Sequence, residues 1–73
     1  MTMFFTYLIV PEGGHAGQAL ARGSLYTSDI DSAKRHAQAG LAAGVEAKPG
    51  LEVILLDDQG REIWRGSYLG RAP

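Results

Sequence analysis

The segment Met3–Val10 constrains the fold of this chain more than any other feature. Its sequence, MFFTYLIV, is apolar or aromatic at every position except Thr6, and Pro11 and the glycine pair at 13–14 end it before a helix of normal length could form. The segment is therefore predicted to be a β-strand. Because successive side chains of a strand point to opposite faces of the sheet, both faces of this strand are apolar and need to be covered.

The size of the chain limits what can cover those faces. The chain has 73 residues, 10 of them glycine, and no cysteine. A chain of this length is expected to form one domain over residues 1–73, with only a thin core. Below about 80 residues such a core is usually supplemented by disulfides, a metal or oligomerisation. The absence of cysteine excludes disulfides and thiolate metal sites, which leaves oligomerisation as the expected supplement.

Charge and hydropathy exclude some classes of protein. Seven Lys and Arg residues balance eight Asp and Glu residues, for a formal net charge of -1, which argues against a nucleic-acid-binding protein. No apolar run approaches the roughly 20 residues that span a bilayer. The first residues carry no basic side chain of the kind that begins a signal peptide. A cytoplasmic protein without a membrane partner is expected.

Three further elements follow along the first two thirds of the chain. Residues 11–19 are rich in glycine and are predicted to be a long, mobile loop. The segment Ala21–Thr27 is predicted to be a second, weaker strand. A helix is predicted over 29–43, because Ser28 and Asp29 can cap its first amide groups and its apolar and small residues recur every three or four positions.

The last part of the chain is predicted to be a β-hairpin, in which strands at 51–56 and 62–69 flank the turn 57–60. In the register of a type I turn followed by a glycine bulge, Leu55 faces Ile63 and Val53 faces Arg65. The residues that then share the helix side are Leu51, Val53, Leu55, Ile63 and Leu69. A two-residue turn, which would pair Glu52 with Arg65, remains an alternative.

These elements predict an α+β fold of order β-β-α-β-β, a four-stranded antiparallel sheet with one helix on one face. One helix cannot cover both faces, and an exposed apolar face of this size usually marks an interface. A homodimer is therefore predicted, formed by stacking of two sheets or by exchange of a hairpin. The expected interface residues are Phe5, Tyr7, Ile54, Trp64 and Tyr68.

No group of residues predicts a catalytic, cofactor or metal site. His15 and His36 lack the spacing of a metal site, and the adjacent acids Asp57 and Asp58 suit a turn better than acid–base catalysis. An enzyme that uses Glu12 and His15 of the glycine-rich loop is the third hypothesis. The first is a non-enzymatic homodimer that serves as a small binding or regulatory module.

The second hypothesis is a nucleic-acid contact on the last two strands. Arg61 and Arg65 could meet phosphates while bases stack on Trp64 and Tyr68, a combination typical of proteins that bind single strands. Glu52 and Glu62 are expected close by and would weaken such a surface. The same aromatic residues are explained more simply as the core of the dimer interface, with the arginines at its rim.

Two short sets of motifs resemble known families. The run 23–33 (GSLYTSDIDSA), with Leu51–Val53 and the turn Asp57–Arg61, resembles a family of small uncharacterised bacterial β-β-α-β-β proteins, which implies the same fold but no activity. Residues 7–10 (YLIV) and 12–15 (EGGH), followed by the capped helix, are similar to HicB-type antitoxins. That resemblance implies a small toxin as partner.

Overall fold

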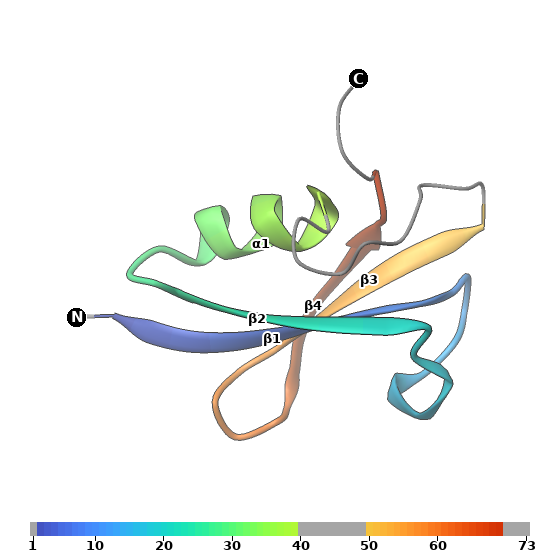
Figure 1. The fold of residues 1–73 in the computed structure, drawn as a ribbon, viewed down its shortest axis with the longest axis horizontal. Helices are drawn as coiled ribbons and strands as arrows, with labels where there is room; N and C mark the ends of the chain where they lie inside the picture. Colours follow the sequence, from blue (N-terminus) through green and yellow to red (C-terminus); the bar gives the residue numbers. More distant parts are fainter. Residues whose placement is uncertain (1, 40–49, 70–73) are drawn as a thin grey trace.

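The computed structural model describes residues 2–39 and 50–69 and confirms the predicted α+β fold (Figure 1). The elements are β1 (Met3–Pro11), the 3-10 turn η1 (Ala16–Gln18), β2 (Ala21–Thr27), α1 (Ile30–Ala39), β3 (Leu51–Leu56) and β4 (Glu62–Ser67). The four strands form one antiparallel sheet in the order β2-β1-β3-β4, so that β1 and β3 are central. Residues 40–43 of the predicted helix lie outside the described residues.

The helix α1 covers one face of the sheet. Two small residues on its inner side, Ala33 and Ala37, are fully buried and let the helix approach the strands closely. They belong to the main core cluster, whose members are Phe5, Tyr7, Ala33, Ala37, Val53 and Leu55. Val53 and Leu55 thus lie on the helix side, as predicted, and Phe5 and Tyr7 lie inside the chain rather than on its surface.

Asp29 caps the helix as predicted. Its carboxylate accepts hydrogen bonds from the amide of Asp31 (3.2 Å) and the hydroxyl of Ser32 (3.0 Å). These bonds, with that of Ser32 foremost, hold the pKa of Asp29 below its ordinary value of 3.8. The cap fixes where the chain leaves β2 and begins to cross the sheet.

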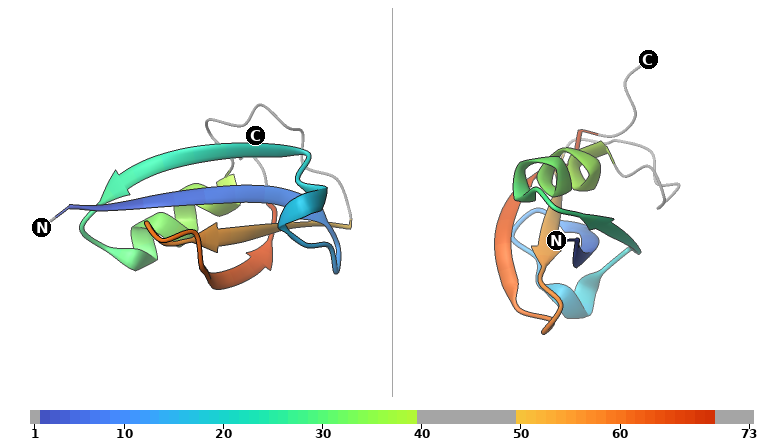
Figure 2. Two further views of the ribbon diagram at one scale, coloured as in Figure 1. Left: turned by 90° about the horizontal axis from the view of Figure 1, so that it is seen from below. Right: turned by 90° about the vertical axis from the view of Figure 1, so that its left-hand side faces the viewer.

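The face opposite the helix is covered by the chain itself, which corrects the prediction of an open apolar face. Leu8, Val10 and Ile54 form a second cluster there and are each at most 1% exposed. The loop that carries η1 lies on this side of the sheet, as both views of Figure 2 show. Ile54 is therefore part of an internal cluster and not an exposed interface residue.

The turn between β3 and β4 has the predicted form. The amide of Gly60 donates to the carbonyl of Asp57 (3.0 Å), and Gly60 adopts a φ of +80°, which favours glycine. The amide of Asp57 donates to the carbonyl of Arg61 (2.9 Å), as expected for a type I turn followed by a glycine bulge.

A second irregularity, one step further along the hairpin, changes the predicted faces. Leu56 pairs with Glu62, but Leu55 pairs with Trp64, so Ile63 is an extra residue in β4. An extra residue moves every following side chain to the other face. Trp64 therefore lies against the helix-side cluster, and its predicted place on the open face is wrong.

The bulge also explains the other differences around β4. Arg65 lies opposite Ile54 instead of Val53, and Ile63 is 39% exposed instead of packing under the helix. Leu69, also predicted on the helix side, is exposed. Tyr68 follows the strand, is 5% exposed, and its amide donates to the carbonyl of Leu51 (3.2 Å). Its side chain is thus buried within one chain.

Candidate functional site

The glycine-rich loop is held to the sheet by an ion-pair network, in contrast to the mobile loop that was predicted. The guanidinium of Arg65 donates from Nη1 to the carbonyl of Gly14 (2.7 Å) and to Glu52 (3.2 Å), and from Nη2 to Glu62 (3.2 Å). The Glu52 carboxylate also accepts from the amide of Gly13 (2.9 Å). We call these four hydrogen bonds, which join the side chains of Arg65, Glu52 and Glu62 to each other and to the backbone of Gly13 and Gly14, the loop clamp.

The clamp alters the acidity of its charged groups. The hydrogen bond from the Gly13 amide, followed by that from Arg65, holds the pKa of Glu52 below its ordinary value of 4.5. The hydrogen bond with Glu62, followed by that with Glu52, raises the pKa of Arg65. Each group is therefore more firmly charged in the folded chain than in the unfolded one.

The clamp is expected to open in acid. Because the pKa of Glu52 is lowered by folding, its stabilising contribution is complete above the unfolded value of about 4.5 and is lost as the pH falls through the lower, folded pKa. In an NMR titration, the amide signal of Gly13 should move with a midpoint below 4.5. The movement should vanish in Glu52→Gln and persist in the control Glu12→Gln. A midpoint at or above 4.5, or movement unaffected by Glu52→Gln, would contradict the clamp.

The predicted nucleic-acid residues are not assembled into one surface. Trp64 lies on the helix side of the sheet, with the ammonium of Lys34 at 5.6 Å from its ring centre, whereas the neighbouring Arg65 points to the other side and belongs to the clamp. Arg61 pairs with Asp57 at 3.3 Å, beside the turn. Among these residues, no aromatic ring on which a base could stack thus lies beside an unpaired guanidinium that could bind the phosphates of a single-stranded nucleic acid.

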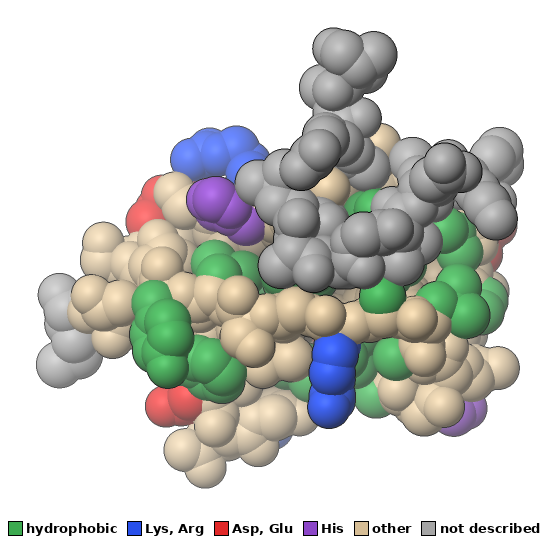
Figure 3. Space-filling view, viewed as in Figure 1, with side chains coloured by type: hydrophobic (Ala, Val, Ile, Leu, Met, Phe, Trp, Pro, Cys, Tyr) green, Lys and Arg blue, Asp and Glu red, His purple; other side chains and the backbone are tan. Residues whose placement is uncertain are grey.

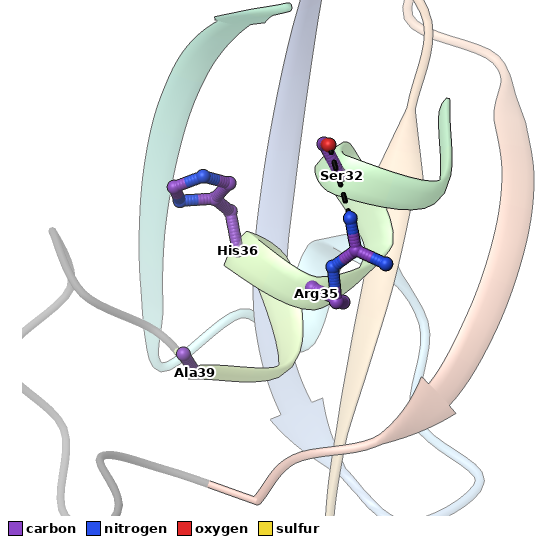
Figure 4. Close-up of a pocket in the computed structure, with 4 residues that line it drawn as sticks. All are labelled: Ser32, Arg35, His36 and Ala39. Atoms are coloured by element: carbon purple, nitrogen blue, oxygen red, sulfur yellow. Dashed lines mark hydrogen bonds between the residues drawn. The ribbon is translucent and has the colours of Figure 1, made fainter. Parts of the chain in front are cut away.

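The two histidines occupy separate structural positions. His15 caps η1: its Nδ1 accepts from the amide of Gly17 (3.1 Å). His36 lines a shallow hollow on the outer side of α1 with Ser32, Arg35 and Ala39. Figure 4 shows Arg35 turned toward Ser32, to which it donates (3.2 Å), while His36 points away from both. Within the described part of the chain, no three His, Asp or Glu side chains come together as a metal site would require.

The remaining candidate is the outer edge of β2, and its chemistry follows from the hydrogen-bond alternation of the sheet. The amide of Glu12 donates to the carbonyl of Gly50 (2.7 Å) and so continues the ladder between β1 and β3. Backbone groups along an antiparallel strand point alternately to its two neighbours. Even-numbered residues of β1 therefore bond to β3 and odd-numbered ones to β2, in agreement with the bond from the amide of Leu20 to the carbonyl of Ile9 (2.7 Å).

The same alternation fixes which groups of β2 are left at the edge. The odd residues of β1 pair with odd residues of β2, for example Tyr7 with Gly23. It follows that the amide and carbonyl groups of Arg22, Ser24 and Tyr26 point away from the sheet. All three residues are exposed. We call these three residues the β2 edge.

The side chains beside this edge are aromatic and basic. Tyr26 is 72% exposed, and its ring lies 5.0 Å from that of Phe4 on the neighbouring strand. Arg22 projects on the same face, two positions beyond Ser24. Figure 3 looks onto this edge and shows a band of backbone and uncharged polar atoms running along β2 between hydrophobic side chains. β2 contains no proline and no bulge, two devices that protect an edge from pairing, and Arg22 is its one charged residue.

The opposite edge of the sheet is protected. β4 carries the bulge at Ile63, and Glu62 and Arg65 form an ion pair along it. A bulge and charged side chains both hinder the addition of another strand. The sequence reasoning missed the β2 edge, since it gave no strand order; the exposed pair Arg22 and Tyr26, on one face of a strand, was the available signal.

The comparisons with known proteins leave this surface as the main guide to function. No protein-family model matches the chain, and neither a curated protein nor a solved structure is significantly similar to it. The resemblances to the small β-β-α-β-β proteins and to HicB-type antitoxins therefore stay predictions. None of the helices in the described residues is long and apolar enough to cross a bilayer.

Proposed function

We propose that this protein is a non-enzymatic binding module that takes up an extended strand of a protein partner at the β2 edge. The observation that carries the proposal is the outward row of backbone donors and acceptors at Arg22, Ser24 and Tyr26, on a strand without a proline or a bulge. A partner strand that pairs with these groups extends the sheet, and its main chain supplies most of the affinity.

The side chains along β2 give such an interaction its selectivity. Tyr26 and Arg22 stand on one face of the strand, where they favour aromatic or acidic side chains of the partner. On the other face Leu25 is half-buried against the helix-side cluster and leaves a small apolar surface. The partner strand is thus expected to alternate between polar or aromatic and apolar residues.

The proposal is tested with displayed heptapeptides selected on the immobilised protein. Selected peptides are expected to bind the Ser24→Pro variant about five- to tenfold more weakly, because proline removes one outward amide donor, and a lost hydrogen bond is worth about 1 kcal/mol. The fold should survive, because proline is tolerated where the amide of an edge strand faces solvent.

The matched control is Ser67→Pro. The bond from the amide of Tyr68 to Leu51 indicates that the amide of Ser67, one residue earlier, points outward from β4, so this variant removes the same donor from the opposite edge. Peptide binding should be unchanged in it. Equal binding to the wild type and Ser24→Pro would contradict the proposed function.

A further inference from the structure

We infer that the partner strand is β2 of a second copy of this chain, and that the two strands pair antiparallel about a two-fold axis at Ser24. The inference rests on the proposed function and names the partner of the same edge. Pairing of the two β2 strands would join the two sheets into one continuous sheet, with each β4 at an outer end. The dimer proposed here forms through a sheet edge and not, as predicted from the sequence, through stacked sheets or an exchanged hairpin.

The register follows from the outward groups. Centring the axis on Ser24 places Ser24 opposite Ser24 of the second copy and Arg22 opposite Tyr26, once on each side of the axis. All outward amides and carbonyls of the β2 edge are then used in hydrogen-bonded pairs. A two-fold interface requires this kind of self-complementarity, in which each contact occurs twice.

The charges agree with the same register. Arg22 is the single charged side chain of β2. Pairing about Ser24 sets each guanidinium against the exposed ring of Tyr26, on which Phe4 already packs from the other side at 5.0 Å. The two Arg22 residues are then separated by about 14 Å along the strand direction, beyond the screening length of about 8 Å. An axis at Arg22 would instead place the two positive charges opposite each other.

The helix-side face of β2 is also complementary to itself. In this register Leu25 lies opposite Gly23 of the second copy. The ring of Tyr7 covers Gly23 so closely that a Cβ there would come within 2.4 Å of Tyr7 Cζ. Leu25 therefore meets an aromatic ring above a glycine, a cross-strand combination that stabilises edges.

Opposite charges at the axis test both the partner and the register. Ser24→Lys and Ser24→Glu each place two like charges directly opposite one another in the homodimer, whereas a mixture of the two variants places unlike charges there. By light scattering, the wild type should approach twice the single-chain mass of 7.8 kDa as its concentration rises. Each variant alone should remain at the single-chain mass, and an equimolar mixture should recover the doubled mass.

The controls separate this inference from the proposed function. Ser67→Lys and Ser67→Glu, on the β4 edge, should dimerise as the wild type does. If the wild type stays at the single-chain mass up to millimolar concentration while heptapeptide binding still depends on Ser24, the second copy is not the partner and the binding function stands. If both Ser24 variants dimerise like the wild type, the axis at Ser24 is wrong. If substitutions at Ser24 weaken neither dimerisation nor peptide binding, both proposals are overturned.

Discussion

Replacing Ile54 with alanine is expected to lower the free energy of unfolding by about 2–4 kcal/mol, by the same amount at every protein concentration. Ile54 is 1% exposed and packs with Leu8 and Val10 on the side of the sheet that the loop covers. Removing three of its carbon atoms loses their burial and leaves a cavity that the sheet and loop fill only in part.

The independence from concentration distinguishes an internal cluster from a dimer interface. The stability lost from an interface residue varies with protein concentration, since association contributes to stability by mass action. Urea unfolding at two protein concentrations a hundredfold apart measures both the loss of stability and its dependence on concentration. Ile63→Ala, at the neighbouring exposed bulge, is the control and should change stability by less than about 1 kcal/mol. If the loss of stability in Ile54→Ala depended on protein concentration, Ile54 would lie at an interface between chains.

Replacing Gly23 with valine is expected to lower the free energy of unfolding by about 1–3 kcal/mol, the usual range for overpacking. A Cβ at this position would lie 2.4 Å from Cζ of Tyr7, nearer than real atoms approach. Tyr7 is 2% exposed and held between the strand and the helix, so its ring cannot move aside. Because Gly23 does not have a positive φ, the expected loss is steric and not conformational.

Two comparisons isolate this steric effect. Ser24→Val places the same side chain on the adjacent, exposed position, where a β-branched residue suits a strand and stability should change by less than about 0.5 kcal/mol. In the background of Tyr7→Leu, Gly23→Val should cost clearly less than in the wild type, since the two residues are in contact. Thermal unfolding of Gly23→Val, Ser24→Val, Tyr7→Leu and the double variant Tyr7→Leu/Gly23→Val gives the loss of stability for each comparison. An equal loss in both backgrounds would show that the ring is not the cause.

The local elements of this fold could be predicted because their signals are local. The apolar run of β1 ends at proline and glycines, the carboxylate of Asp29 precedes the helix, and the turn at Asp57–Gly60 requires a glycine where the structure has a φ of +80°. Each of these signals acts within a few residues. The predicted boundaries of β2 coincide with the observed ones for the same reason.

The faces of β4 could not be predicted, because one extra residue decides them. The sequence of β4 contains no signal that Ile63 is unpaired in the ladder with β3. Without this bulge, Trp64 is predicted on the face of the sheet opposite the helix. The room for the ring is provided by Gly66, where a Cβ would lie 2.4 Å from the Trp64 ring. A tryptophan followed two positions later by glycine was thus the available sign that both lie on one crowded face.

The cover of the second face was missed for a different reason. A loop rich in glycine is expected to be mobile when only its backbone entropy is considered. Here Arg65 and Glu52, distant in sequence, reach its carbonyl and amide groups and offset that entropy with charge-assisted hydrogen bonds. Such contacts depend on the strand order and on the bulge, and neither of these can be predicted from a pattern of neighbouring residues.

Amide exchange along β2, measured by NMR at two protein concentrations, tests most directly whether the β2 edge is the binding surface and the second copy its partner. In dilute solution the outward amides of Arg22, Ser24 and Tyr26 should exchange freely, while that of Gly23 is protected by its bond to β1. In concentrated solution the three outward amides should become protected, and that of Ser67 at the opposite edge should not change. Exchange of the three amides at the same rate in both solutions would contradict pairing of β2 with a second copy.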